Sequence, residues 1–119
     1  MKRVWMLAAL IAVAATRAEA EGDAAHGQQI YESRCIACHS PDANRVGPMH
    51  RGVFGRKAGS LADYTYSKAL KGTDFVWNDE TLDKWLTNPQ AFVPGQKMNF
   101  KVTKPEDRAD IIAYLKTLR

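Results

Sequence analysis

The sequence predicts a small all-α domain of three to five helices joined by long loops. Several segments carry apolar residues at helical spacing directly after residues that cap helices. Strand signals are weak, because no segment keeps a sustained apolar/polar alternation. Residues 40–62 are rich in Gly and Pro and predict an extended loop. A loop of this length is uncommon in a compact domain unless a ligand organises it, so the fold is expected to wrap around a large cofactor.

The first predicted helix follows Asp23, whose carboxylate can cap it. The helix is expected to run from Ala24 to about Arg34. Ile30 and Tyr31 lie on its apolar side. This helix therefore leads directly into the only two cysteines of the chain.

Two short helices are predicted in the middle of the chain. Ser67 can cap the first, residues 68–71, and Gly72 stops it. Asn78 can cap the second, residues 79–87. The second helix carries apolar side chains at the spacing i, i+3 and i+4, namely Leu82, Trp85 and Leu86.

The last predicted helix has the clearest pattern. Thr103 and Glu106 have the spacing of a capping box, and Pro105 falls in the first turn, where its missing N–H costs nothing. One apolar stripe follows, made of Ile111, Tyr114, Leu115 and Leu118. The stripe predicts a face that packs on another helix.

Residues 1–20 are predicted to be a secretory signal peptide. A short basic start precedes an almost wholly apolar run at 4–15, and Ala18 and Ala20 are small residues at the positions that signal peptidase reads. The run is short for a bilayer span, which needs ~20 residues. Cleavage after Ala20 would leave 21–119 as one exported, periplasmic domain without stable membrane insertion. An uncleaved anchor and a buried N-terminal helix are the alternatives.

The composition limits the partners of the exported domain. The full chain has a formal net charge of +4, and loss of residues 1–20 removes three basic residues and one acidic one, which leaves +2. No Lys/Arg-rich run or basic helix face is present, so no nucleic-acid partner is expected. A domain of this size buries a modest fraction of its surface, so its core is marginal unless a further group fills it.

Residues 35–39 read Cys-Ile-Ala-Cys-His, the attachment signature of c-type haem. Two thiols three residues apart in a helical turn match the separation of two haem vinyl groups, and His39 then lies under the iron as an axial ligand. A zinc site would need a second pair of ligands, and a thioredoxin-like dithiol would need a βαβ context. A disulfide would leave the histidine unexplained. We expect one covalent haem c, with its iron, on Cys35, Cys38 and His39.

Four residues are candidates for the second axial ligand: His26, Met49, His50 and Met98. Three of them lie near the attachment site or on its helix. Met98 lies in a polar, turn-rich stretch, residues 88–100, from which it can reach the far haem face; an ordinary, partly exposed methionine is the alternative. A Met thioether favours Fe(II). A six-coordinate iron has no open position, which favours electron transfer over oxygen or peroxide chemistry.

In their order and spacing, several segments resemble the class I cytochromes c, the group of mitochondrial cytochrome c and the bacterial cytochromes c2 and c-550. The resemblance covers essentially all of the chain after the predicted signal peptide, from about Gly22 to Leu118. Its segments are Cys35-x-x-Cys38-His39, Gly47-Pro48, 52–59, 64–67, Trp77, Asn88-Pro89, 94–98 and 108–115.

The resemblance implies a role for each matching residue. The carbonyl of Pro48 would accept a hydrogen bond from Nδ1–H of His39 and fix the ring. Four residues would surround or bond the haem propionates, which are costly to bury without donors: Arg56, Tyr64, Tyr66 and Trp77. Plain aromatic core packing is the alternative for the last three. Gly27 and Tyr31 would cross the last helix near Tyr114, with no room for a side chain at Gly27.

The sequence also departs from the pattern of these cytochromes. His50 stands where leucine is usual; it is expected to be a polar residue near the haem edge and not a ligand. Trp85 replaces a tyrosine, and Leu70 replaces an asparagine, of the polar network beside Met98. The ring of lysines around the haem edge is thinned, with Gln29 and Gln90 at positions where lysines are common. These losses weaken the case for a strongly acidic partner.

Together these features predict a monomeric, periplasmic single-electron carrier that cycles a low-spin His39/Met98 haem between Fe(II) and Fe(III), and not an enzyme. Its partners would be membrane or periplasmic redox proteins of a respiratory or photosynthetic chain: a bc1 complex, a terminal oxidase, a reaction centre or a dehydrogenase. The alternatives are a dedicated electron-accepting subunit of a periplasmic dehydrogenase, and a haem enzyme or gas sensor with a labile sixth ligand.

Overall fold

The computed structural model describes residues 2, 8–12 and 22–119. The predicted cleavage point and most of the predicted signal peptide lie outside these residues. Within the described residues, no helix has the length and apolar character that a membrane span requires.

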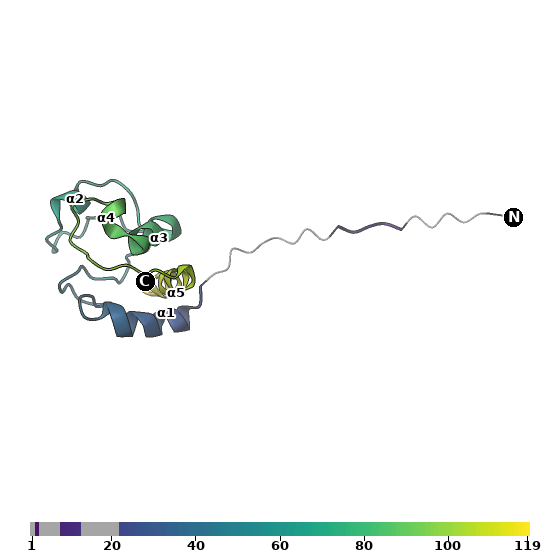
Figure 1. The fold of residues 1–119 in the computed structure, drawn as a ribbon, viewed down its shortest axis with the longest axis horizontal. Coiled ribbons are helices and arrows are strands. Elements are labelled where there is room, and N and C mark those ends of the chain that lie inside the picture. The colour runs from purple at the N-terminus through teal and green to yellow at the C-terminus, as the bar shows by residue number, and fades with distance from the viewer. Residues whose placement is uncertain (1, 3–7, 13–21) are drawn as a thin grey trace.

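The described chain is all-α, as predicted. Its helical segments, in order, are α1 (Ala24–Ile30), the π-helical η1 (Tyr31–Cys35), α2 (Lys68–Lys71), α3 (Asp79–Thr87), α4 (Pro89–Phe92) and α5 (Pro105–Thr117). Residues 22–119 contain no strand, and one isolated antiparallel bridge joins Lys57 to Val76. In Figure 1, α1 and α5 lie side by side on one side of the domain, α2, α3 and α4 lie on the other, and long loops connect them.

The crossing of α1 and α5 is the main helix contact. Asp23 caps α1, accepting hydrogen bonds from the backbone N–H groups of Ala25 and His26 at 3.0 and 3.2 Å. At Gly27, a Cβ atom would lie 1.8 Å from the carbonyl oxygen of Asp110, so only glycine lets the two backbones come this close. The expected close crossing at Gly27 is confirmed.

The end of the first helix differs from the prediction. The chain widens into a π-helical turn over η1, closed by a hydrogen bond from the N–H of Ile36 to the carbonyl of Tyr31 at 3.2 Å. The ring of Tyr31 packs on that of Tyr114, 5.1 Å between centroids, as expected. The π-helical turn leads directly into the Cys35–His39 segment. The hydrophobic spacing of the sequence does not distinguish it from an α-helical turn.

The middle helices match their predicted bounds. Ser67 accepts from the N–H of Leu70 at 3.1 Å and caps α2. At the start of α3, Asn78 and Thr81 cap each other's backbone N–H groups at 2.9 and 2.8 Å. Helix α4 was not predicted. Asn88 ends α3 and also caps α4 through the N–H of Ala91 at 3.2 Å, and four residues are too few to show a helical period.

The predicted capping box before α5 is wrong. Lys104 is the N-cap, one residue later than expected, so the side chain of Thr103 is out of register with the first free N–H groups. Pro105 occupies the first turn as predicted. Instead, Arg108 donates to the carbonyls of Val102 and Thr103 at 2.9 and 3.2 Å and so fixes the backbone directly before the helix.

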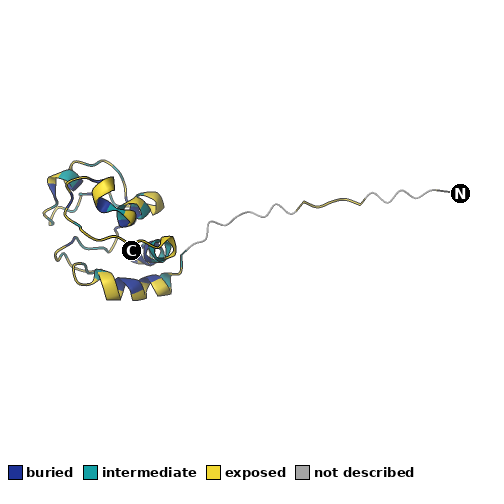
Figure 2. Cartoon of the chain, viewed as in Figure 1, coloured by how far each residue is buried: buried dark blue, intermediate teal, exposed yellow. Residues whose placement is uncertain are grey.

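The core lies between the two groups of helices. The predicted stripe of α5 is buried, together with Ile112. Both α1 and α3 have buried and exposed faces, as the colours of Figure 2 show. The buried apolar residues are Ile30, Tyr31, Val53, Ala58, Leu70, Trp77, Leu82, Leu86, Val93, Val102, Ile111, Ile112, Tyr114, Leu115 and Leu118.

Candidate haem site

The attachment segment is a tight turn at the end of η1. The N–H groups of Cys38 and His39 donate to the carbonyl of Cys35 at 3.2 and 2.9 Å. Both thiols are free: that of Cys35 packs against the core, and Cys38 is exposed. Burial raises the pKa of the Cys35 thiol to about 11.

A hydrogen bond sets the tautomer of His39. Its Nδ1 lies 3.2 Å from the carbonyl oxygen of Pro48. A carbonyl only accepts, so Nδ1 carries the proton and Nε2 keeps the lone pair that a metal needs. Burial lowers the pKa of His39, which keeps the ring neutral. A Cβ atom at Gly47 would lie 2.1 Å from Cε1 of His39, so the glycine leaves room for the ring.

Arg45 is a site residue that the sequence analysis missed. Its guanidinium donates to the carbonyls of Ile36, Ala37 and His39, the last two at 3.4 and 3.1 Å. The N–H of Gly47 also donates to the carbonyl of Cys38 at 2.9 Å. These bonds satisfy the carbonyls of the attachment turn, which has no helix after it to do so. An arginine ten residues after a cysteine carries no signal in the sequence alone.

The two tyrosines predicted to lie near the propionates come together around one cavity. Their rings meet edge to face, 4.7 Å between the centroids of Tyr64 and Tyr66. The hydroxyl of Tyr64 donates to the carbonyl of Val46 at 2.6 Å, and the hydroxyl of Tyr66 accepts from the N–H of Leu61 at 3.2 Å. The cavity has a volume of about 370 Å³ and is lined by residues 59–62, 64–66 and Lys71.

Arg56 and Trp77 lie on neighbouring backbone segments. The N–H of Trp77 donates to the carbonyl of Arg56 at 2.8 Å. The guanidinium of Arg56 donates to the carbonyls of Met49 and Arg51 at 2.8 and 2.6 Å, and burial lowers its pKa. The ring of Trp77 is buried against Trp85, 5.3 Å between centroids. The structure therefore pairs these two residues, with Arg56 bonded to the loop after His39.

Met98 lies in the turn that follows α4 and is partly buried. Its N–H donates to the side-chain oxygen of Gln96, which is itself buried. The amide nitrogen of Gln96 donates to Gln90 at 3.4 Å, and Gly95 has a φ of +91°, which other residues rarely adopt. Gln96 therefore shapes the turn that presents Met98, a role that the sequence pattern did not indicate.

The two histidine candidates for the second axial position are engaged elsewhere. The ring of His50 stacks on that of His39, with centroids 4.0 Å apart and planes 19° apart, which puts it on the side of His39. Burial holds the pKa of His50 well below its usual value. His26 lies on α1 and bonds Asp110 through Nδ1 at 2.6 Å.

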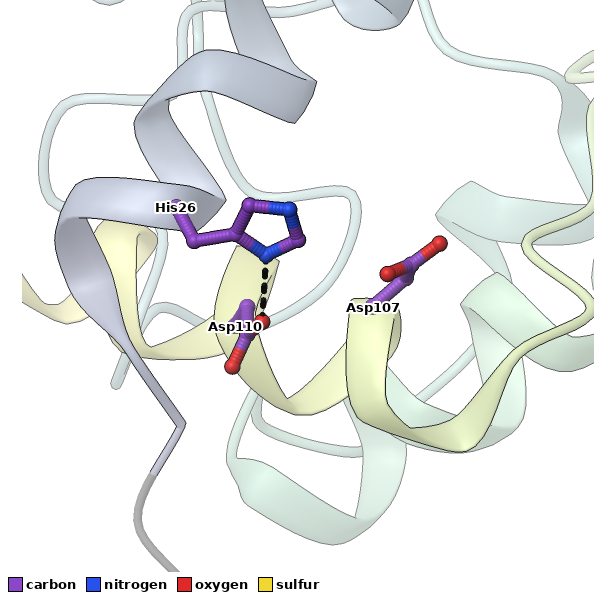
Figure 3. Close-up of side chains that lie close together, drawn as sticks. All are labelled: His26, Asp107 and Asp110. Atoms are coloured by element: carbon purple, nitrogen blue, oxygen red, sulfur yellow. Dashed lines mark hydrogen bonds and ion pairs between the residues drawn. The ribbon is translucent and has the colours of Figure 1, made fainter.

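His26 lies in a cluster with two carboxylate side chains at the α1–α5 crossing (Figure 3). One ligand atom each from His26, Asp107 and Asp110 lies within 4.8 Å of the others, a spacing that could hold a metal ion. The carboxylate of Asp110, however, accepts from His26 and also from the N–H of Asp23 at 2.7 Å. These bonds explain the cluster as a contact that links α1 to α5.

Comparison with known proteins identifies the family. A family model described as cytochrome c matches residues 24–119. The chain belongs to the cytochrome c family. Cytochrome c of Euglena viridis is 48% identical over 101 residues, covering 82% of this chain and 99% of that protein. Cytochrome c of Arabidopsis thaliana is 43% identical over 99 residues, covering 80% and 88%.

A solved structure agrees with the family. Cytochrome cH from Methylobacterium extorquens has a TM-score of 0.77 and 47% sequence identity, covering 81% of this chain and 99% of that one. The predicted class I cytochrome c family and its small all-α fold are thereby confirmed. As a cytochrome c, the chain carries covalently bound haem c with its iron and serves as an electron carrier. Two free thiols followed by an imidazole with a free Nε2 fit that cofactor.

Proposed function

We propose that this cytochrome c is a periplasmic one-electron carrier in which His39 and Met98 would hold the haem iron. The observation that supports this best is the hydrogen bond from Nδ1 of His39 to the carbonyl of Pro48, which directs the Nε2 lone pair to a metal. The two thiols of Cys35 and Cys38 attach the group next to this imidazole. Haem c supplies a one-electron couple when it is bound.

The residues around the site hold the group and its charges in this proposal. Tyr64, Tyr66, Arg56 and Trp77 provide the polar edge at which the propionates bind. The Tyr66 hydroxyl and the Arg56 guanidinium can donate to a propionate, and donors lower the cost of burying a carboxylate. Ala69 lies next to the turn that precedes Met98, because a Cβ atom at Gly95 would be 3.3 Å from the Cβ of Ala69.

The proposed location rests on residues 1–20, whose basic start, apolar run and small-residue ending are those of a signal peptide. Residues 21–119 are then the cytochrome c domain. Mass spectrometry of the protein recovered from the periplasm tests this. The expected product begins at Glu21 and carries one haem, and a full-length product would contradict the proposal.

The proposed partners are membrane or periplasmic redox proteins: a bc1 complex, a terminal oxidase, a reaction centre or a dehydrogenase. Docking between such carriers is weak and uses a small interface. The domain is proposed to act as a monomer with no catalytic turnover of its own. Size-exclusion chromatography at high salt separates this from a dedicated enzyme subunit, because a subunit would remain bound to its enzyme.

Replacing Met98 with Ala tests the ligand set. The far-red charge-transfer band of the oxidised protein marks Met–Fe bonding, and Met98→Ala is expected to abolish it and to let carbon monoxide bind the reduced protein readily. Met49→Ala is the matched control, because Met49 lies on the loop after His39, and it should keep the band. Survival of the band in Met98→Ala, or its loss in Met49→Ala, would overturn the assignment.

A further inference from the structure

His50 contacts the attachment site from a loop that is fixed by its backbone. The N–H of His50 donates to the carbonyl of Ser40 at 3.2 Å, and that of Arg51 donates to the carbonyl of Pro41 at 2.8 Å. These two bonds join the chain after Pro48 to the chain directly after His39. The position of His50 therefore does not depend on its own side chain.

The imidazole of His50 is held by two groups. One face stacks on the His39 ring, with centroids 4.0 Å apart and planes 19° apart. Its Nδ1 forms a hydrogen bond of 2.9 Å with the hydroxyl of Tyr31. Tyr31 is almost fully buried and belongs to η1, the π-helical turn that ends at Cys35. The hydroxyl of Tyr31, on the attachment helix, is thus an anchor for the His50 imidazole that does not depend on His39.

The hydrogen bond to Pro48 does not by itself fix the plane of His39. At 3.2 Å it constrains one ring atom, Nδ1, and the ring can still tilt about that contact. The nearly parallel ring of His50, 4.0 Å away, opposes such tilting, because a tilt of His39 would make the two rings collide or move them apart. A leucine, which is usual at this position in the class I cytochromes, has no flat ring to stack on His39 and no group that can form a hydrogen bond with Tyr31.

We propose that His50 is a positioning residue for the axial ligand: stacked on His39 and anchored by the Tyr31 hydroxyl, it sets the rotation of the His39 imidazole plane. The inference rests on the proposed function, because it takes His39 as the iron ligand. It goes beyond that function by assigning a role to a side chain that neither attaches the haem nor binds the iron. The rotation of an axial ligand plane sets the unpaired spin density on each haem methyl group in the oxidised state.

The test is the proton NMR spectrum of the oxidised, haem-loaded protein. His50→Leu is expected to shift the haem methyl resonances and to change the differences between them. His50→Phe keeps a flat ring for stacking and should retain most of the wild-type pattern. Tyr31→Phe keeps the ring and removes only the hydroxyl, and it should shift the resonances in the same direction as His50→Leu by a smaller amount. The reduction potential of each variant is the second readout.

The controls separate positioning from general loss of structure. His26→Gln alters the α1–α5 crossing away from the attachment turn, so it should leave the methyl pattern unchanged. An unchanged pattern in His50→Leu, or the same change in His50→Phe as in His50→Leu, would overturn the inference. If His50→Leu fails to load haem, Tyr31→Phe decides: a wild-type pattern there would overturn the anchoring by Tyr31.

Failure of the proposed function would look different. If the wild-type protein lacked a low-spin spectrum with the Met–Fe band, the His39/Met98 ligation would be wrong, whatever the His50 variants did. If that spectrum were present and His50→Leu left the methyl resonances in place, only the positioning role would be lost.

Discussion

The α1–α5 crossing and the loops around the attachment turn are held together in different ways. At the crossing, α1, which is capped by Asp23, meets α5 through a glycine, a pair of tyrosine rings and one ion pair. Around the attachment turn, side chains of the following loops satisfy backbone carbonyls that no helix or sheet uses. Arg45, Arg56 and Tyr64 each donate to such carbonyls. The crossing is therefore built by backbone proximity, and the loop side by side-chain donors.

This comparison predicts that a methyl group added in each region has a different consequence. A change at the crossing should lower stability and leave the haem spectrum alone. A change beside His39 should alter the spectrum as well. Three predictions test this difference, from the largest expected effect to the smallest.

Gly27→Ala should destabilise the haem-loaded protein by about 2–4 kcal/mol, because the new Cβ would lie 1.8 Å from the carbonyl oxygen of Asp110 and the helices must move apart. Denaturant unfolding measures the loss, and the far-red band should remain. Gly72→Ala is the matched control. Gly72 has a φ of −80°, and its nearest contact would be 3.3 Å, so its cost should be smaller. Equal costs at the two glycines would contradict the close crossing.

Gly47→Ala should displace the His39 ring, since a Cβ there would lie 2.1 Å from Cε1. The expected loss of stability is about 1–3 kcal/mol, typical of strain from an added methyl group. Unlike Gly27→Ala, this variant should also shift the absorption spectrum and the haem methyl resonances. Visible and NMR spectra of both variants at the same pH give the comparison. A Gly47→Ala protein with the wild-type spectrum would show that the ring is not confined by this glycine.

The ion pair between His26 and Asp110 should make stability depend weakly on pH. The hydrogen bond that His26 donates to Asp110 raises the pKa of His26 above its ordinary value of 6.5, so the contribution of His26 to stability is complete below pH 6.5 and is lost as pH rises through the raised value. For Asp110, burial would raise the pKa, but the bonds from His26 and the N–H of Asp23 outweigh it and lower it. Its contribution is present above pH 3.8 and is lost as pH falls through the lowered value.

His26→Gln should remove the alkaline part of this dependence. The melting temperatures of the wild-type protein and of His26→Gln, measured from acid to mildly alkaline pH, should differ most between pH 3.8 and pH 6.5. They should converge at higher pH as His26 loses its proton. The effect should be small because His26 is solvent-exposed. Parallel curves across the whole range would mean that the pair contributes nothing through its charge.

The helix ends that the sequence predicted correctly are those set by bonds between residues close together in the chain. Helix bounds at α2 and α3 were predictable because the caps, Ser67 and Asn78, are neighbours of the groups they satisfy. The predicted capping box before α5 was wrong because the helix begins one residue after the position that Thr103 could cap, at Lys104, whose side chain makes no capping bond. Helix α4 and the π-helical turn η1 were missed because neither changes the apolar period over enough residues.

The sequence by itself determined the cofactor chemistry. The spacing of Cys35, Cys38 and His39 is a local property of five residues, and the order of the segments around it identified the family that the comparisons confirm. The close approach at Gly27 also followed from the resemblance. These features depend on the identity of residues and their separation along the chain, which the sequence states directly.

The tertiary structure alone decided what surrounds that motif. It brought Arg45 onto the carbonyls of the attachment turn, and the ring of His50 onto His39 with Tyr31 as its anchor. Each of these contacts depends on where a loop lies in space. Loop positions are set by the packing of the whole domain, so no spacing along the chain predicts them.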